Sequence, residues 1–246
     1  MRFDIYGRFE PTVRREGRET SARPSATIAD LIAFAERHPR LLVLTGAGLS
    51  TGSGIPAYRD RAGQWRRSAP IQHRDFLASH AVRQRYWARS LVGWRSFGRA
   101  QPNRGHRALA ALEARGRVEL LVTQNVDGLH QRAGSHEAVD LHGRVDRVIC
   151  LHCGAVEKRA ELQARLERDN PALVDWVAAA GPDGDADVEG FDTGAVTVPD
   201  CERCGGALKP DVVFFGDSVP RQRVEQAMAA LARADALLVV GSSLMV

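Results

Sequence analysis

The chain has 246 residues, enough for one good hydrophobic core with a smaller module beside it. Its hydrophobic content of 44% and charged content of 26% are those of an ordinary globular protein. The net charge of +4 rests on scattered arginines, and no block of five like charges marks a nucleic acid surface. No apolar run approaches the ~20 residues of a membrane span, and the N-terminus lacks the apolar core of a secretory signal. We therefore expect a cytoplasmic protein without a membrane or nucleic acid partner.

The first elements are a helix and a buried strand. Residues 1–25 show no periodicity, which predicts an irregular arm. Apolar residues recur at helical spacing over residues 27–37, and Thr27 followed by Asp30 resembles a capping box. The wholly apolar run 41–44 predicts a parallel strand that leads into a glycine turn.

The middle of the chain predicts further helices and strands. The polar and aromatic stretch 61–104 is expected to be helical in parts and to form a lid or cleft wall. A helix is predicted over residues 106–115, with Gly116 ending it. Residues 120–122 predict a second buried strand, and residues 145–149 predict another.

The remaining pattern alternates in the same way. Helices are predicted over residues 157–168 and 221–233, and strands over 212–215 and 236–240. The apolar strands end in polar or glycine-rich loops with helices between them, which is typical of a doubly wound parallel sheet that binds ligands at its strand ends.

One acidic segment imitates a metal loop. Asp183, Asp185 and Asp187 are spaced like the start of a calcium-binding loop, but Val188 and Gly194 stand where such a loop needs its glycine and its glutamate. We therefore expect a solvated acidic loop.

The four cysteines form two C-x-x-C pairs, Cys150 with Cys153 and Cys201 with Cys204. Because the chain carries no export signal, this pattern favours metal binding in a reducing compartment over disulfides. Four thiolates suit tetrahedral zinc and leave no position open for a substrate, so the site is expected to be structural. A redox-active C-x-x-C is the alternative.

The polar loops after the strands are candidate ligand-binding segments. The glycines of the loop Gly46-Ala47-Gly48 could let the backbone approach a pyrophosphate, although the glycine spacing also suits a plain tight turn. Gln124, Asn125 and Asp127 could bind a ribose or an amide, or could cap the next segment. His142 has a side chain whose ordinary pKa suits a general base, and it could equally be a buried structural histidine.

Taken together, these segments resemble the sirtuins, which are NAD-dependent protein deacylases. The similarity runs in family order from about residue 40 to the end, through the segments 46–50, 53–59, 123–130, 141–143, the two cysteine pairs, 209–217 and 241–244. The segments 70–73, 85–89 and 212–217 are similar to those of the class II branch.

The resemblance implies a Rossmann-type α/β fold with an inserted small zinc-binding domain. The NAD-binding domain would comprise residues 26–144 and 211–246, and the zinc domain residues 145–210. The co-substrate would be NAD, and the protein partner an acyl-lysine protein or peptide held in the cleft between the domains. The products would be nicotinamide, O-acyl-ADP-ribose and deacylated protein.

Site residues are implied by position. Nucleotide contacts would come from Gly46, Ala47, Gly48, Ser50, Tyr58, Arg59, Gln124, Asn125, Val126, Asp127, Gly241, Ser242 and Ser243. His142 would be the catalytic base, and one structural zinc ion would be held by Cys150, Cys153, Cys201 and Cys204. The peptide would add as a strand beside Val212, Val213, Phe214 and Phe215.

Some features stay open at this level. Tyr86 and Arg89 have the spacing of sirtuins that prefer acidic acyl groups, since one helical turn could aim both at a carboxylate, whereas the class II features suggest other long acyl chains. Mono-ADP-ribosyl transfer and a non-catalytic NAD-binding module are alternative functions. The sequence stops at Val246, where sirtuins continue with a strand and a helix, so we expect a truncated chain or weak NAD binding. The oligomeric state is not determined.

Overall fold

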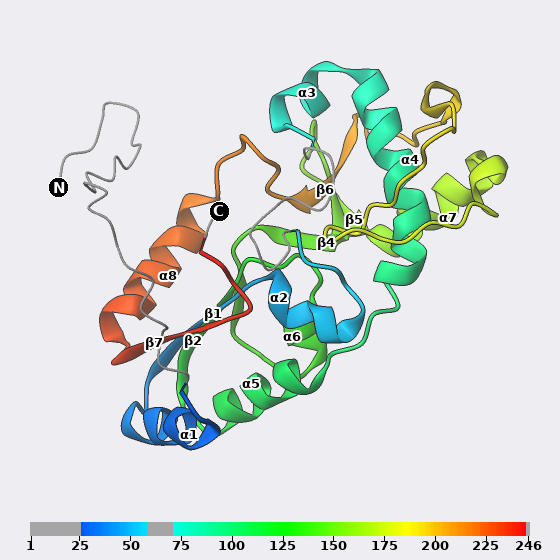
Figure 1. The fold of residues 1–246 in the computed structure, drawn as a ribbon. Coiled ribbons are helices and arrows are strands. Elements are labelled where there is room, and N and C mark those ends of the chain that lie inside the picture. Colours follow the sequence, from blue (N-terminus) through cyan, green and yellow to red (C-terminus); the bar gives the residue numbers. More distant parts are fainter. Residues whose placement is uncertain (1–25, 59–70, 245–246) are drawn as a thin grey trace, which may run out of the picture. The chain divides into compact units, whose positions relative to one another are not determined.

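The computed structural model describes residues 26–58 and 71–244 (Figure 1). The chain divides into two units, residues 1–36 and 37–246. Helix α1 (Ile28–Arg37) accounts for most of the described part of the first unit. The amide of Thr27 donates to Asp30 Oδ2 at 2.8 Å, and the amide of Asp30 donates to Thr27 Oγ1 at 3.2 Å. The predicted capping box is therefore confirmed.

The second unit contains two sheets, of which the first is parallel. Its strands stand in the order β3 (Ala138–Asp140), β2 (Val118–Thr123), β1 (Leu41–Thr45) and β7 (Ala236–Val240). Burial explains the apolar runs of β1 and β2, because helix α8 (Arg221–Arg233) packs its Ala230 against the sheet and α5 (Arg104–Ala114) also contacts β2. Strand β7 is only partly buried. The predicted parallel Rossmann-like sheet is confirmed.

The register of this sheet places its loops together. Thr45 at the end of β1 stands opposite Thr123 of β2 and Val240 of β7. Because the three strands are parallel and end at one level, the loops that follow them meet at the same edge (Figure 1). Strand β3 was not predicted, since it has only three residues and Val139 is its one fully buried position.

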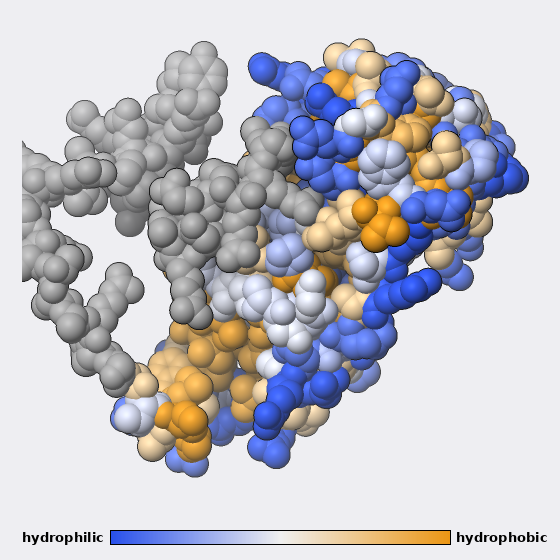
Figure 2. Space-filling view, turned by 45° about the vertical axis from the view of Figure 1, so that its right-hand side comes forward, coloured by the Kyte–Doolittle hydropathy of each residue, from blue (hydrophilic) through white to orange (hydrophobic). Residues whose placement is uncertain are grey.

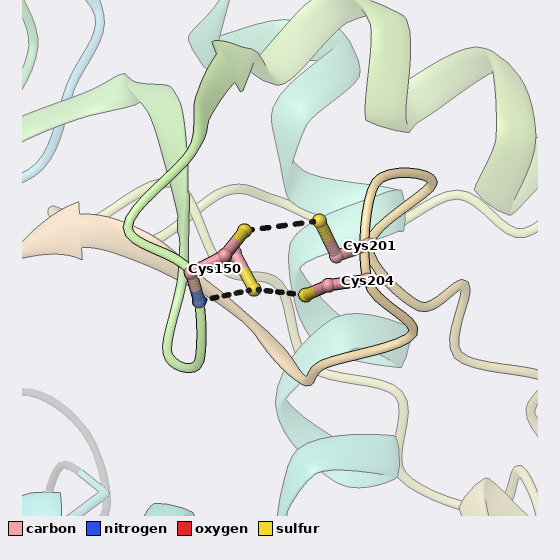
Figure 3. A group of neighbouring side chains, drawn as sticks. Cys150, Cys201 and Cys204 are labelled. Atoms are coloured by element: carbon pink, nitrogen blue, oxygen red, sulfur yellow. Dashed lines mark hydrogen bonds between the residues drawn. The ribbon is translucent and has the colours of Figure 1, made fainter.

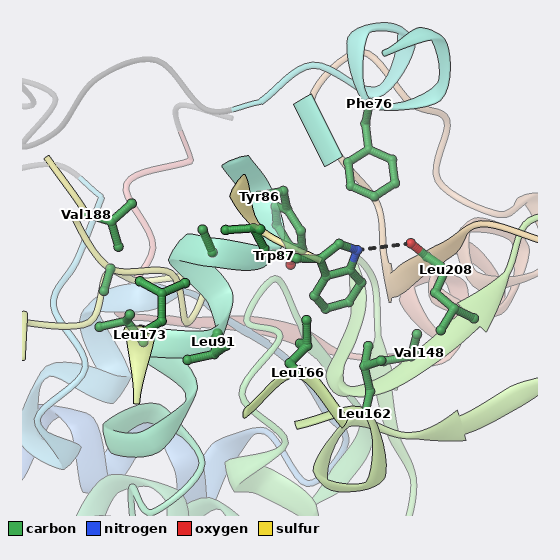
Figure 4. Packing of buried hydrophobic residues seen from close by; sticks show 14 of the residues in the cluster. Phe76, Tyr86, Trp87, Leu91, Val148, Leu162, Leu166, Leu173, Val188 and Leu208 are labelled. Atoms are coloured by element: carbon green, nitrogen blue, oxygen red, sulfur yellow. Dashed lines mark hydrogen bonds between the residues drawn. The ribbon is translucent and has the colours of Figure 1, made fainter. Parts of the chain in front are cut away.

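The second sheet of this unit is antiparallel and lies in sequence between β3 and β7. Its strands stand in the order β5 (Val156–Lys158), β4 (Gly143–Cys150) and β6 (Leu208–Val212). Helices α7 (Arg159–Asp169) and α4 (His80–Phe97) pack beside it. Trp87 is the largest fully buried side chain of their common core, and its Nε1 donates to the Leu208 carbonyl at 3.3 Å (Figure 4). The predicted boundaries after residues 144 and 210 fall within β4 and β6, and the division into domains stays a prediction.

Several predicted boundaries differ from the structure, and strand pairing explains two of these differences. The strand expected over 212–215 is β6, which ends at Val212, because its partner β4 begins at Gly143 and offers no further residues to pair with. The helix expected from residue 157 begins at Arg159, because the two preceding residues pair with β4. The shorter elements are α2 (Ala47–Ser50), α3 (His73–Ala78), α6 (Leu129–Arg132) and the 3-10 turns Thr51–Ser53, Pro171–Leu173 and Thr193–Ala195.

A buried cation stands between α7 and α4. Arg159 is fully buried, and its guanidinium carbon lies 5.4 Å and 5.1 Å from the ring centroids of Trp87 and Trp94. It also donates to the carbonyl and the hydroxyl of Ser90. Burial lowers the pKa of Arg159 to about 10, so the group is still charged at neutral pH. The two indole faces thus help to offset the cost of burying this charge.

A buried histidine lies beneath the edge where the strand loops meet. His130 is 1% exposed, and its Nε2 lies 2.8 Å from Thr45 Oγ1. The Thr45 hydroxyl donates to Thr123 Oγ1 at 2.8 Å, so it accepts the proton of the ring nitrogen. Burial lowers the pKa of His130 to about 3. The neutral ring therefore ties α6 to the ends of β1 and β2.

This histidine makes stability sensitive to acid. In the unfolded chain a histidine binds a proton below about pH 6.5, whereas buried His130 stays neutral down to about pH 3. The folded state is therefore not penalised by this residue above pH 6.5, and its free energy of unfolding falls as the pH drops below that value. We expect His130 alone to lower the free energy of unfolding by about 2 kcal/mol between pH 7.5 and pH 5. Urea unfolding of the zinc-loaded protein at both pH values measures it.

The matched variant for this measurement is His130→Gln, whose amide can replace Nε2 but does not titrate. The variant should lose that part of the pH dependence, whereas His136→Gln, at an exposed position, should keep it. Equal pH dependence in His130→Gln and the natural chain would contradict the assignment.

Candidate active site and metal centre

The loops after β1 and β7 pack backbone against backbone. The amide of Gly48 donates to the Gly241 carbonyl at 2.8 Å. A Cβ atom at Gly48 would lie 2.8 Å from that carbonyl oxygen, and one at Gly46 would lie 2.9 Å from it. Gly241 itself has a φ of 68°, which favours glycine. Close approach of the two loops therefore accounts for these glycines, whatever ligand the loops bind.

Side chains from the loop after β2 complete the junction. Ser242 Oγ donates to Gln124 Oε1 at 2.7 Å. The amide nitrogen of Asn125 donates to the Gly46 carbonyl at 3.1 Å, and Asn125 is 8% exposed. Hydrogen bonds thus hold the three strand-end loops as one wall.

Ser50 and Asp127 lie behind this wall. Ser50 is 1% exposed, and its hydroxyl donates to Asp127 Oδ2 at 2.6 Å and accepts from the Asn125 amide at 3.1 Å. Asp127 Oδ1 also accepts from the amide of Leu129 at the start of α6. The capping role that the sequence allowed for Asp127 is therefore present. The structure directs the Ser50 hydroxyl to protein partners, away from the ligand contact expected for it.

A cavity of about 560 Å³ opens in front of the wall. Most predicted ligand residues line it: Ala47, Gly48, Tyr58, Tyr86, Arg89, Gln124, Asn125, Val126, His142, Val212, Val213, Phe214, Phe215, Gly241, Ser242 and Ser243. Gly46, Ser50 and Asp127 do not line it, and Arg59 lies outside the described residues. Segments far apart in the sequence thus meet around one concave space of ligand size.

His142 stands at the junction of the two sheets, between β3 and β4. Its Nδ1 lies 3.0 Å from the carbonyl oxygen of Gln124. Because a carbonyl can only accept, Nδ1 carries the proton of the neutral ring and Nε2 keeps a free lone pair. Burial lowers the pKa of His142, with the Gln124 carbonyl acting in the opposite direction. The residue is thus a neutral, oriented base at the cavity.

The segment after β6 crosses the cavity with fixed ends. The amide of Val213 donates to the His142 carbonyl at 2.8 Å, and the Phe215 carbonyl accepts from the amide of His73 at 2.9 Å. Lys209 Nζ lies 4.6 Å above the Phe214 ring, which also meets Phe76 edge to face. These contacts fix the segment that is predicted to bind the substrate peptide, although residues 213–215 are not part of a strand.

The acidic loop departs from its prediction. Asp183 and Asp185 line the cavity instead of facing solvent, and Asp185 forms an ion pair with Arg89. The expectation of a solvated acidic loop is therefore wrong for these two residues and holds only for exposed Asp187. The sequence offers a calcium loop or a solvated loop for these aspartates, and it holds no signal for their position beside α4, which results from tertiary packing.

The four cysteine side chains converge at the far end of β4 from His142 (Figure 3). Their sulfur atoms lie within 4.8 Å of one another, with Cys150 and Cys204 at 3.5 Å and Cys153 and Cys201 at 3.8 Å. Sulfurs around tetrahedral zinc would stand about 3.8 Å apart, so the group fits zinc. Among the described residues it is the one His, Cys, Asp or Glu group that could hold a metal.

The position of this centre bears on its role. The two ends of β4, Gly143 beside His142 and Cys150, pair with Val212 and Leu208 of β6, which are four positions apart, a span of roughly 13 Å. With all four ligands supplied by sulfur, the ion has no open position for a substrate. The centre can therefore join β4 to the turn before β6, and it can take no part in chemistry at the cavity.

A parallel sheet with strand-end loops around a cavity, joined to a four-cysteine module, defines a dinucleotide-binding α/β protein of the zinc-containing kind. Residues 46–246 match the Sir2 family, and the chain belongs to that family. The predicted fold is thereby confirmed.

Relatives and solved structures agree with this membership. An NAD-dependent protein deacetylase of Xanthomonas campestris pv. campestris (strain 8004) is 61% identical over 213 residues, which are 87% of this chain and 73% of the relative. One of Bordetella bronchiseptica is 60% identical over 206 residues, covering 84% and 75% of the two chains. The solved complex of Sir2 with a p53 peptide and NAD+ is 30% identical, with a TM-score of 0.71 and coverage of 90% and 78%.

The outer surface adds two observations. Within the described residues, no helix has both the length and the apolar character needed to cross a membrane. On the face shown in Figure 2, hydrophilic residues cover much of the upper part, and the apolar residues there are scattered among them.

Proposed function

We propose that this protein uses NAD to remove acyl groups from lysine side chains of proteins, giving nicotinamide, O-acyl-ADP-ribose and the deacylated lysine. The observation that carries the proposal is His142, a neutral and oriented base beside a cavity that strand-end loops and the 213–215 segment enclose together. Relatives at about 60% identity are named NAD-dependent protein deacetylases, which supports the same activity here.

The cavity fits a dinucleotide at one side. Gly48 and Gly241 bring two backbones together without side chains, and Ser242 and Gln124 supply polar groups beside them. These residues would hold NAD, which supplies a nicotinamide–ribose bond whose cleavage opens the ribose carbon to attack by the acyl oxygen. The tethered loops need little rearrangement on binding, which limits the entropic cost.

The protein residues then position and move a proton. The Gln124 carbonyl keeps the proton of His142 on Nδ1, so Nε2 is available to take a proton from a ribose hydroxyl. The segment Val213–Phe215 lines the cavity, where an acyl-lysine peptide would pair with its backbone. The aromatic side chain of Phe214 and its neighbour Tyr86 exclude water from the acyl chain. Holding the reactants in this geometry supplies much of the rate.

Nicotinamide release from NAD tests the proposal. We expect release by the zinc-loaded protein to depend on an acetyl-lysine peptide, with equal amounts of nicotinamide and deacetylated peptide. Release without peptide, together with labelling of protein by ADP-ribose, would instead indicate ADP-ribosyl transfer. No release under either condition, with NAD bound, would indicate a non-catalytic module and would contradict the proposal.

The pH dependence of the same assay measures the protonation of His142, the proposed base. His142 must be neutral to accept a proton, and burial lowers its pKa below the ordinary value of about 6.5. Activity should therefore be complete at neutral pH and fall only as the pH drops through a midpoint below 6.5. A midpoint above 6.5 in kcat/KM would contradict the lowered pKa.

A further inference from the structure

The loop over residues 181–186 brings two carboxylates to the wall of the cavity. Asp183 and Asp185 line the cavity together with Tyr58, Tyr86 and Arg89. The Asp185 side chain is only 13% exposed and the Arg89 side chain 19%. This part of the cavity is therefore shielded from solvent, where charges interact more strongly than at the surface.

The loop is seated firmly on α4. The amide of Ala186 donates to the Arg89 carbonyl at 2.9 Å. A Cβ atom at Gly93 of α4 would lie 2.5 Å from the Gly184 carbonyl, and Gly184 itself has a φ of 78°. The two glycines allow a backbone contact that no larger residue would permit. The aspartates on either side of Gly184 are thus held in place.

Arg89 is already engaged in this arrangement. One terminal nitrogen of its guanidinium pairs with Asp185 Oδ2, and its Nε donates to the Ala186 carbonyl at 3.3 Å. An incoming carboxylate would have to displace Asp185 or share the guanidinium with it. Either course is unfavourable, because two carboxylates would stand together in a partly desolvated site.

Asp183 adds an acceptor for which the described residues supply no donor. Its Oδ1 is buried and makes no hydrogen bond to any residue of the ranges 26–58 and 71–244. Burial raises the pKa of both Tyr58 and Tyr86, and the charge of Asp183 is the next largest cause for each. The cavity is therefore negative at this point, and a hydrogen-bond donor on a ligand would satisfy an acceptor that is otherwise unpaired.

We propose that Asp183 and Asp185 select the acyl group: the cavity rejects acyl chains that end in a carboxylate and accepts neutral chains that end in a hydrogen-bond donor. The inference rests on the proposed lysine deacylation, and it assigns to Asp185 the role of neutralising Arg89. By spacing alone, Tyr86 and Arg89 could hold an acidic acyl group. Because Asp185 already pairs with Arg89, the two residues favour an uncharged acyl group instead.

Two nearly isosteric acyl-lysine peptides test this selection. Succinyl-lysine ends in a carboxylate, and succinamyl-lysine ends in a neutral amide of almost the same size. In kcat/KM we expect the natural chain to prefer succinamyl-lysine by about tenfold or more, because a like charge in a desolvated site costs at least the ~1.4 kcal/mol that corresponds to tenfold. The acetyl group carries no charge and has no ionic interaction with either aspartate, so acetyl-lysine peptide serves as the reference substrate.

Variants separate the two carboxylates. Asp185→Asn should free the Arg89 charge and raise the succinyl-to-succinamyl ratio about tenfold or more. Asp183→Asn should reduce the advantage of succinamyl-lysine by removing the charged acceptor. Asp187→Asn, an exposed position of the same segment that does not line the cavity, should leave the ratio and the acetyl-lysine activity unchanged.

Peptide binding keeps this test independent of catalysis. Fluorescence anisotropy of the labelled peptides on the zinc-loaded protein, without NAD, should show the same order of affinities and the same change in Asp185→Asn. If no peptide yields nicotinamide, the proposed function fails while the binding order still decides the selectivity. Equal handling of the two peptides by the natural chain, or an unchanged ratio in Asp185→Asn, would overturn the inference.

Discussion

Replacement of His142 by alanine is expected to lower deacylation of an acetyl-lysine peptide by about 10²–10⁴-fold while the protein stays folded. The ring supplies a neutral base at the cavity whose proton position is set by the neighbouring carbonyl of Gln124. Removing it leaves the loops, the cavity and the cysteine group intact, so binding should change much less than turnover. The loss should therefore appear mainly in kcat.

Steady-state kinetics with saturating NAD measure this effect, and thermal unfolding followed by circular dichroism checks the fold. His136→Ala is the matched control, because that histidine is exposed and stands outside the cavity. It should retain the kcat of the natural chain. A His142→Ala protein that keeps more than about a tenth of the activity would rule out general base catalysis by this residue.

Replacement of Cys150 by serine is expected to abolish zinc binding and cooperative folding together. Structural zinc in small sites contributes about 10–16 kcal/mol of apparent binding free energy, whereas a whole domain is stable by about 5–15 kcal/mol. Cys150 ends β4, whose other residues pair with both β5 and β6. Loss of one ligand should therefore disorder this sheet first, and activity should be lost as a consequence.

Zinc content by atomic emission and the thermal unfolding curve measure the result. His152→Ala is the control, since His152 is exposed on the same turn and is not one of the four ligands. It should bind one zinc ion per chain. A Cys150→Ser protein with the same unfolding temperature as the natural chain would contradict a structural role for the metal. Activity that depends on a reductant, without bound zinc, would favour a redox-active cysteine pair.

Features of the sequence that depend on local chemistry were predicted well. The runs that became β1, β2 and β7 were recognisable because each is a continuous apolar stretch. Burial on both faces explains this for β1 and for the second half of β2, whereas β7 has no fully buried residue and its Leu237 is exposed. The capping box at Thr27 and the cysteine pairs were recognisable because a few neighbouring atoms define each of them. His142 and most residues of the cavity followed from motif resemblance, and the structure brings them together.

Features that depend on distant partners were not predicted. The position of β6 depends on where β4 begins, and its apolar sequence continues beyond the last paired residue. Burial of Arg159 depends on Trp87 and Trp94 of another helix. No pattern within a single segment contains this information.

The polar and acidic loops show most clearly which features follow from the sequence and which follow from the tertiary structure. The sequence by itself determined that glycines follow the first strand, that aspartates alternate after residue 182 and that four thiols are paired, because those are properties of neighbouring residues. Only the tertiary structure decided that the glycines serve the contact with Gly241 and that Ser50 lies behind the cavity. It also placed Asp185 on Arg89, since an ion pair between residues 96 positions apart forms only when packing brings α4 and the loop into contact.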